Sequence, residues 1–472
     1  MASIIVCGGG VIGLAAATML ARDRHQVTVL EADSEGPPAV PAAAWERWHR
    51  KGVAQFRQPH NVFPRFRQVC DAELPELPGR LAAAGCPWVD PLGAPERGGM
   101  LPPGLSDHEP REGDEAFRYV TGRRPAVEAA IAAMAAEQPG VVIRRGVRAT
   151  GLIGGPPAIS GVPHVAGVRT SAGHELDADL VVDAMGRRSP GAGLLTALDA
   201  RPPRVEAETS GFAYYTRYFT GPSQPPLRGP VLTPLGTISV LTLYGDNGTW
   251  SVTLYASSQD APTKALRDAE VFTRVVRACP LQAHWLDGEP VTGVLPMAGI
   301  ADRYHRFVVD GTPVATGFAA VGDAWACTNP SGGRGVSIGI IHSQLLRHTV
   351  RSHLGDPAGF AQAWDEGTES QVAPFYRNQI SADRFRLAEM TALRQGRPWT
   401  PPDSPMSRLA NAAAWDPDAF RAFLATIMCL ELPQDVLTRP DIQDTLERIG
   451  DKTPPPFPGP DRQCLLQLLD AS

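Results

Sequence analysis

A glycine-rich turn between a short apolar strand and an apolar helix constrains the fold more than any other feature of the chain. Gly8, Gly10 and Gly13 form the pattern G-x-G-x-x-G within VCGGGVIG. The preceding residues 3–7 (SIIVC) are typical of a buried parallel strand, and residues 14–21 (LAAATMLA) favour a buried helix. In this context the pattern indicates a dinucleotide-binding β-α-β unit rather than an ordinary tight turn.

An acidic residue completes this unit. Residues 26–30 (QVTVL) predict a second strand, and Glu31 follows at its end, where a carboxylate can accept hydrogen bonds from ribose hydroxyls. Gly8 permits the tight turn, Gly10 lets the backbone approach a pyrophosphate, and Gly13 lets helix and strand pack closely. The N-terminus of the helix then offers unpaired N–H groups to the anion.

Composition places the chain among globular proteins and excludes several functions. It has 472 residues, 43% of them hydrophobic, and a formal charge of -6, which argues against a nucleic-acid surface. No apolar run is long enough for a membrane span, and the first residues lack the basic region of a signal peptide, so we expect a cytoplasmic protein. The seven cysteines include no C-x-x-C pair, which favours reduced thiols and no metal site.

Two later segments have the composition needed to complete a large cofactor site. The first is Arg124 in RRPAVE, at the start of a predicted helix over residues 124–137, although a solvated helix end would read the same way. The second is VGDAWACTNPSGGRGVSIG, in which an Asp after a strand can bind a ribityl hydroxyl and a glycine run can bring N–H groups to a flavin edge. A merely tight turn is the alternative for this segment. Its candidate residues are Gly322, Asp323, Pro330, Gly332, Gly333 and Gly335.

Together the three segments resemble the FAD-dependent monooxygenases and oxidoreductases of the para-hydroxybenzoate hydroxylase-like superfamily. The resemblance implies an α/β fold: a glutathione-reductase-like Rossmann FAD domain, an inserted antiparallel β-sheet substrate domain of α+β type, and a helical C-terminal region. It implies that the first glycines and Glu31 hold the ADP half of FAD, Arg124 the diphosphate, Asp323 the ribityl chain, and Gly332, Gly333 and Gly335 the edge of the ring.

The resemblance and the residue patterns together predict the domain boundaries. We expect the FAD domain in residues 1–90, 116–200 and 296–378, with an excursion at 91–115 toward the substrate domain. The substrate sheet is expected in residues 201–295, because residues 211–219 alternate and residues 238–255 form two strands about Asn247 and Gly248. Residues 379–472 are expected to be helical, and either to cover the pocket or to form a homodimer contact.

Other elements are expected along the chain. Residues 45–66 are predicted to be a long, ordered connection without periodicity, residues 74–84 a helix and residues 141–153 one strand. Further helices are expected over residues 336–341, 344–353, 358–378 and 382–394.

Three reactions are compatible with the sequence. In the preferred one, reduced FAD and O2 give a flavin C4a-hydroperoxide that hydroxylates or epoxidises a substrate. The alternatives are an FAD-dependent dehydrogenase or C=C reductase, and a halogenase, for which the segment GTWSV at 248–252 has only the first Trp of W-x-W-x-I-P. The chain has no second G-x-G-x-x-G after a strand, so a separate NAD domain is not expected. NAD(P)H is expected to reduce the flavin either directly or through a separate flavin reductase.

Candidate catalytic and substrate residues follow from two segments. His60 and Arg57 in RQPHNVF are candidates for groups beside the flavin ring, with a structural imidazole as the alternative for His60. Phe212, Tyr214 and Trp250 are candidates for the walls of an apolar pocket, with packed core as the alternative. The predicted substrate is an apolar or aromatic organic small molecule, in keeping with specialised metabolism.

Overall fold

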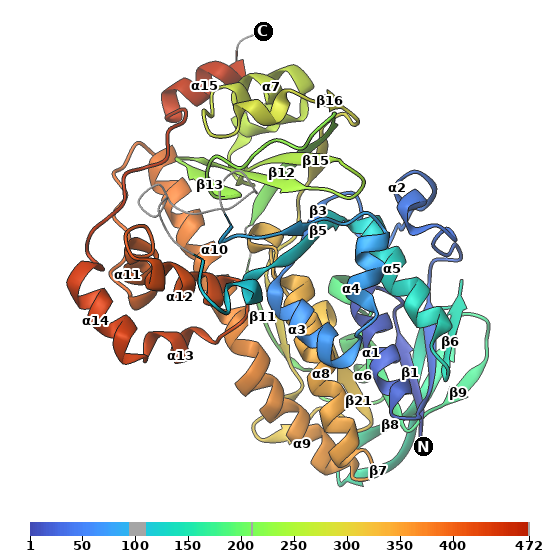
Figure 1. Cartoon of the computed structure of the whole chain (residues 1–472). Coiled ribbons are helices and arrows are strands. Elements are labelled where there is room, and N and C mark those ends of the chain that lie inside the picture. The colour runs from blue at the N-terminus through green and yellow to red at the C-terminus, as the bar shows by residue number, and fades with distance from the viewer. Residues whose placement is uncertain (94–109, 209–210, 471–472) are drawn as a thin grey trace.

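A parallel sheet of five strands forms the base of the molecule (Figure 1). The computed structural model describes residues 1–93, 110–208 and 211–470, so most of the predicted excursion at 91–115 lies outside the described residues. The strand order in the sheet is β21-β10-β1-β2-β6. These strands are β21 (Phe318–Ala320), β10 (Leu180–Asp183), β1 (Ser3–Cys7), β2 (Gln26–Glu31) and β6 (Val141–Arg145).

Helix α1 (Val11–Arg22) is buried on nearly all sides and contacts both α5 (Arg124–Glu137) and α8 (Gly335–His353). Its alanines explain how three helices approach one another at the sheet, because small side chains allow close packing. The predicted strands 3–7 and 26–30 and the helix 124–137 are confirmed. Helix α1 begins three residues before the predicted residue 14, directly after the glycine turn.

The predicted single strand at 141–153 is wrong. Strand β6 ends at Arg145, the chain turns at Gly146 with φ +72°, and β7 (Ala149–Ile159) begins a separate antiparallel sheet. That sheet has the order β7-β8-β9, with β8 (Val162–Thr170) and β9 (Glu175–Asp177). The positive φ at Gly146 lets the chain leave one sheet for the other, and hydrophobic alternation alone does not mark such a change.

Residues 45–66 contain more regular structure than expected. The segment includes α2 (Ala44–Arg47) and β3 (Pro59–Val62), and it leads into α3 (Pro64–Glu73), which the sequence analysis missed. Strand β3 pairs with β5 (Tyr119–Arg123), which in turn pairs with β4 (Trp88–Val89). The predicted helix 74–84 corresponds to the shorter α4 (Leu77–Ala83).

A six-stranded antiparallel sheet lies above the parallel one (Figure 1). Its order is β13-β14-β15-β12-β16, and β17 also pairs with β12. The predicted hairpin is confirmed, since β14 pairs with β15 through a turn in which Asn247 and Gly248 both have positive φ. The strands are β12 (Phe212–Thr220), β13 (Leu232–Leu235), β14 (Ile238–Tyr244), β15 (Trp250–Ser257), β16 (Glu289–Pro290) and β17 (Leu295–Met297).

Short elements complete these two layers. Helix α7 (Ala269–Arg277) covers the outer face of the antiparallel sheet, where its apolar side packs into the second hydrophobic core. The others are α6 (Gly191–Thr196), β11 (Arg204–Ala207), β18 (Arg303–Arg306), β19 (Val308–Val309), β20 (Thr312–Pro313) and β22 (Ala326–Cys327).

The C-terminal third is helical, as expected. Three of the predicted helix boundaries are wrong. Residues 336–341 and 344–353, predicted as two helices, form the single helix α8. The predicted helix 358–378 is interrupted by a π-helical turn at Thr368–Val372, and residues 373–378 and 382–394 lie together in the single helix α10 (Ala373–Arg394). The remaining helices are α9 (Pro357–Gly367), α10 (Ala373–Arg394), α11 (Pro405–Ala412), α12 (Pro417–Ile427), α13 (Pro433–Leu437), α14 (Pro440–Ile449) and α15 (Arg462–Asp470).

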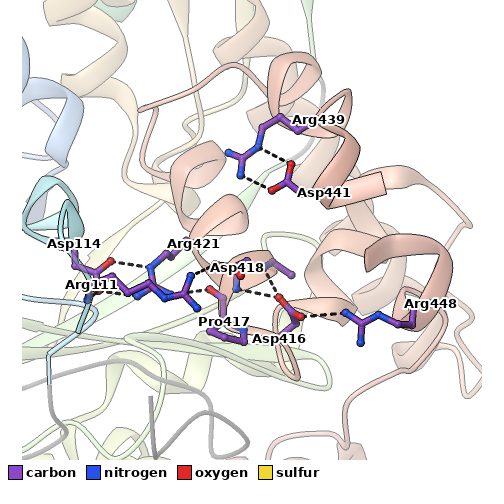
Figure 2. A network of polar contacts seen from close by, with 10 residues as sticks. Arg111, Asp114, Asp416, Pro417, Asp418, Arg421, Arg439, Asp441 and Arg448 are labelled. Atoms are coloured by element: carbon purple, nitrogen blue, oxygen red, sulfur yellow. Dashed lines mark hydrogen bonds and ion pairs between the residues drawn. The ribbon is translucent and has the colours of Figure 1, made fainter. Parts of the chain in front are cut away.

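Ion pairs fasten the C-terminal helices to the rest of the chain. The guanidinium of Arg421 on α12 donates from Nε and Nη2 to both oxygens of Asp114, at 2.7 Å each (Figure 2). Arg111 pairs with Asp418 at the start of the same helix. Within the described ranges, no helix combines the length and apolarity that a membrane crossing requires.

Candidate active site

A cavity of about 1130 Å³ is lined by residues of the two large sheets and of the C-terminal helices. Its volume exceeds the roughly 300–1,000 Å³ of pockets for drug-sized ligands, so it has room for a large cofactor together with a substrate. The three predicted cofactor segments converge on it. The predicted residues that line it are Gly8, Gly10, Glu31, Arg124, Asp323, Pro330, Gly332, Gly333 and Gly335.

The three glycines of the first turn meet different surroundings. Gly8 has φ +111°, and a Cβ added there would lie 2.3 Å from the carbonyl oxygen of Ala184. A Cβ on Gly13 would lie 2.0 Å from the carbonyl oxygen of Gly8, whereas a Cβ on Gly10 would meet no atom within 4 Å. Gly8 and Gly13 are therefore required by the packing of the chain itself, and Gly10 faces open space in the cavity.

The N-terminus of α1 opens into this space. Its N-cap residue is Gly10, which offers no side-chain hydrogen bond to the first turn. Uncapped N–H groups and the positive end of the helix dipole favour an anion at this position. The residues present therefore fit the pyrophosphate of a dinucleotide.

A buried ion-pair network stands beside this helix end. The Oε2 atom of Glu31 accepts the N–H of Gly9 at 2.9 Å and pairs with Arg50. Arg50 also pairs with Glu128 on α5, which in turn accepts from Nε of Arg124 at 2.7 Å. Although burial raises it, the pKa of Glu128 is held below its usual range by Arg50 and Arg124. Arg50 was missed because it lies in a segment without periodicity.

Asp323 and Gly322 follow the last strand of the parallel sheet. Asp323 lines the cavity, and burial raises the pKa of its carboxyl group. Gly322 does not line it; with φ +60° it forms the turn, and a Cβ there would lie 3.1 Å from Ile12. Gly322 thus shapes the backbone, while Asp323 presents its side chain to the cavity.

His60 and Arg57 are separated by the fold. His60 lines the cavity, and burial together with the charge of Arg124 lowers the pKa of its imidazole to about 3. Its Nδ1 lies 3.1 Å from the carbonyl oxygen of Gln58, and because a carbonyl can only accept, Nδ1 carries the proton and Nε2 is left as an acceptor. A neutral ring of this kind can accept a hydrogen bond at Nε2, but with this pKa it is only a weak base at neutral pH.

Arg57 lies outside the cavity. Its guanidinium donates to the carbonyl oxygen of Trp45 and is 4.5 Å from the centre of the Trp45 ring. Together with Arg123 it lines a smaller pocket elsewhere. These contacts satisfy the side chain away from the cofactor segments, so we assign Arg57 no role in the cavity.

The three predicted substrate residues also divide. Phe212 and Tyr214 on β12 line the cavity, and the hydroxyl of Tyr214 donates to Oδ1 of Asn329. Trp250 packs in the second hydrophobic core, where its Nε1 donates to the carbonyl oxygen of Trp285 at 2.8 Å. Side-chain alternation along the strands therefore placed two residues on the cavity face and one in the core.

A buried carboxylic acid that the sequence analysis missed lies beside the glycine run. Asp383 on α10 lines the cavity and accepts from the hydroxyl of Ser331 and from Nε2 of Gln379, the latter at 3.1 Å. Burial and the nearby charge of Asp302 raise the pKa of Asp383 to about 7. Its place on a helix remote in sequence gave no local signal. No cluster of three metal-ligating side chains occurs in the described part of the chain.

Comparison with known proteins places the chain in a family. The model of the FAD dependent oxidoreductase family matches residues 3–348. No curated protein matches the chain.

Solved structures share the fold at low identity. The flavin-dependent brominase Bmp2 superposes with a TM-score of 0.62 at 15% identity, covering 94% of this chain and 98% of its own. The p-nitrophenol 4-monooxygenase PnpA from Pseudomonas putida DLL-E4 has a TM-score of 0.57 at 17% identity, covering 93% and 98%. The Diels-Alderase PyrE3 of pyrroindomycin biosynthesis has a TM-score of 0.59 at 16% identity, covering 90% and 80%.

These matches confirm the expected α/β fold with an antiparallel sheet and a helical C-terminal region. The match extends over most of the chain and includes all three segments that converge on the cavity. The chain therefore belongs to the FAD dependent oxidoreductase family and is an enzyme that uses FAD.

Proposed function

We propose that this enzyme is an FAD-dependent monooxygenase that hydroxylates or epoxidises an apolar or aromatic organic molecule. The observation that carries the proposal is the single large cavity in which the cofactor segments and an apolar, aromatic wall face each other. The names of PnpA and Bmp2 add support from proteins of the same fold, although a fold alone does not determine a reaction.

The proposed cofactor half of the cavity is built from chain segments with distinct tasks. Gly10 and the N-terminus of α1 would receive the diphosphate, with Arg124 beside it. Glu31 would bind the ribose, since it lines the cavity at the end of β2 and its Oε1 accepts one N–H, from Asp33, which leaves a lone pair for a hydroxyl. Gly332, Gly333 and the following helix would face the ring, which supplies the oxygen chemistry once it is reduced.

The proposed substrate half is closed by two layers. Phe212 and Tyr214 lie on the strand face, and the C-terminal helices contribute Phe420, Phe423 and Met428. A wall of this composition excludes water, and exclusion of water prevents side reactions such as hydrolysis of reactive intermediates and proton leakage. The C-terminal helices thus act as a cover for the site, which is one of the two roles expected for them.

His60 would serve this site as a hydrogen-bond acceptor. It lines the cavity close to Arg124, and its Nε2 is free to accept because Nδ1 is engaged by Gln58. A substrate hydroxyl would donate a hydrogen bond to that atom and be oriented by it.

Spectroscopy of the purified holoenzyme tests the proposal. The visible flavin band is recorded without oxygen before and after NADPH is added; bleaching means that NADPH reduces the flavin directly, and persistence means that a separate reductase or the substrate supplies electrons. The protein reduced with dithionite is then mixed with O2 in a stopped-flow instrument. A monooxygenase is expected to recover the flavin band in two phases. A dehydrogenase is expected to recover it in one phase, and that result would contradict the proposal.

A further inference from the structure

One buried guanidinium in the cavity has no partner of opposite charge among the residues that the structure describes. Arg334 lies in the glycine run, directly before α8, and only 7% of it is exposed. Its side chain lines the cavity. Among the residues that the structure describes, neither Nε nor Nη1 of Arg334 has a hydrogen-bond acceptor.

This arrangement differs from that of the other buried arginines. Each of these other buried arginines forms an ion pair with a carboxylate. The pairs are Arg50 with Glu128, Arg123 with Asp246, Arg124 with Glu128, Arg347 with Asp23, and Arg386 with Glu389. A guanidinium stays protonated even when buried, and a buried charge without a partner is costly, so Arg334 calls for an anion.

The titratable groups nearest to Arg334 do not supply that anion. Asp383 is held by Ser331 and Gln379, and burial raises its pKa to about 7, so at neutral pH it is only partly ionised. Burial also raises the pKa of the Cys429 thiol to about 11, so that group is neutral. Arg65 on α3 lies near the same thiol and adds positive charge rather than removing it.

The pKa of Arg334 itself is consistent with this. Burial lowers the pKa of Arg334 by more than Cys429 and Asp383 raise it. At Arg50, by contrast, the carboxylates of Glu128 and Glu31 outweigh burial, and the pKa is raised. The protein therefore stabilises the charge of Arg50 and leaves that of Arg334 to something outside the described chain.

We propose that the substrate is an organic acid whose carboxylate binds the guanidinium of Arg334 while its apolar part lies against Phe212 and the C-terminal helices. This inference rests on the proposed function, because it names the substrate class of the same cavity. A planar guanidinium whose Nε and Nη1 lack acceptors in the described chain suits a carboxylate, which can accept two parallel hydrogen bonds.

Binding of a matched pair of probes to the FAD-loaded enzyme tests the inference. Naphthoate and its neutral isostere naphthamide are titrated while the visible flavin spectrum and the heat of binding are recorded. The wild-type enzyme is expected to bind naphthoate about tenfold or more tightly than naphthamide, because only the carboxylate pairs with the charge of Arg334. Equal affinity, or no binding of naphthoate, would overturn the inference.

Two variants distinguish binding of the carboxylate by Arg334 from a general effect of positive charge in the cavity. Arg334→Met keeps a long flexible side chain without charge and is expected to abolish the preference. Arg386→Met removes another cavity-lining guanidinium, which already donates to Ser239 and pairs with Glu389, and is expected to retain it. A preference that survives Arg334→Met would show that the carboxylate binds elsewhere.

A thermal-unfolding measurement without any probe tests the inference independently of the probes chosen. If Arg334 lacks a partner, Arg334→Met is expected to raise the Tm of the FAD-loaded enzyme. A lowered Tm would mean that the flavin or the chain already balances the charge, and the inference would fail. None of these readouts needs turnover, so an enzyme that shows the preference but recovers its flavin band in one phase would refute only the proposed monooxygenase reaction.

Discussion

Alanine substitutions at Gly10 and Gly13 should separate the effect of the first turn on FAD binding from its effect on the stability of the fold. A methyl at Gly13 would lie 2.0 Å from the carbonyl oxygen of Gly8, so α1 must move away from the sheet. Overpacking of this kind typically costs about 1–3 kcal/mol. Gly13→Ala is therefore expected to lower the free energy of unfolding by that amount, with or without FAD.

Gly8→Ala should be more severe. Its Cβ would lie 2.3 Å from the carbonyl oxygen of Ala184, and φ is +111°, a conformation that adds roughly 1–3 kcal/mol for a residue with a side chain. Because both penalties act on the folded chain, the two sum to roughly 2–6 kcal/mol.

Gly10→Ala should behave differently. Its Cβ meets no atom of the chain within 4 Å, so the stability of the FAD-free protein should change by less than about 1 kcal/mol, the difference between Gly and Ala as helix N-caps. The methyl would stand where the diphosphate approaches the helix end, and we expect FAD affinity to fall about tenfold or more, or about 1.4 kcal/mol.

The assay is urea unfolding of the FAD-free proteins followed by titration with FAD, monitored by quenching of flavin fluorescence. If Gly10→Ala binds FAD as tightly as the wild type, the diphosphate does not lie at this turn. If it destabilises the FAD-free protein as much as Gly13→Ala does, the space described at Gly10 is occupied by the chain, and the reasoning fails on structural grounds.

Three further perturbations address the layers around the cavity. Asp246→Asn should lower the free energy of unfolding by about 3–5 kcal/mol, measured in urea, because it leaves the buried guanidinium of Arg123 unpaired, whereas a loss below about 1 kcal/mol would contradict the ion pair. Since burial raises the pKa of Asp383 to about 7, the native state binds the extra proton, and the stability that this contributes is lost as pH rises from about 4 to 7. Asp383→Asn should therefore gain stability relative to the wild type across that window, and a constant difference from pH 4 to 8 would refute the shift. Arg421→Met removes both bonds to Asp114 (Figure 2) and should cost roughly 1–3 kcal/mol and speed proteolysis of α12; unchanged cleavage would mean that the pair does not hold the cover.

The parts of the fold that could be predicted from sequence are those determined by neighbouring residues. The glycine turn and its two strands were predicted because strand, turn and helix signals follow one another within about thirty residues. The helix beginning at Arg124 was predicted from its own run of helix-forming residues. The hairpin at Asn247 and Gly248 was predicted for the same reason, since positive φ at two successive positions is a local requirement. The convergence of three cofactor segments was expected from the family resemblance.

Features that depend on contacts between distant segments could not be predicted. The division of residues 141–153 between two sheets depends on the strand with which each part pairs. Arg57 lies outside the cavity because its guanidinium is hydrogen-bonded to the carbonyl oxygen of Trp45. Asp383 lies on a helix more than 50 residues beyond Ser331 in sequence and meets it only through folding.

The same distinction applies to charge. The sequence by itself determined that the chain carries a G-x-G-x-x-G unit, an acidic residue at the end of the second strand and an arginine within the later glycine run. Only the tertiary structure decided that Arg50 is paired and that Arg334 has no partner among the described residues, because burial and pairing depend on which side chains the packed layers bring within a few ångströms.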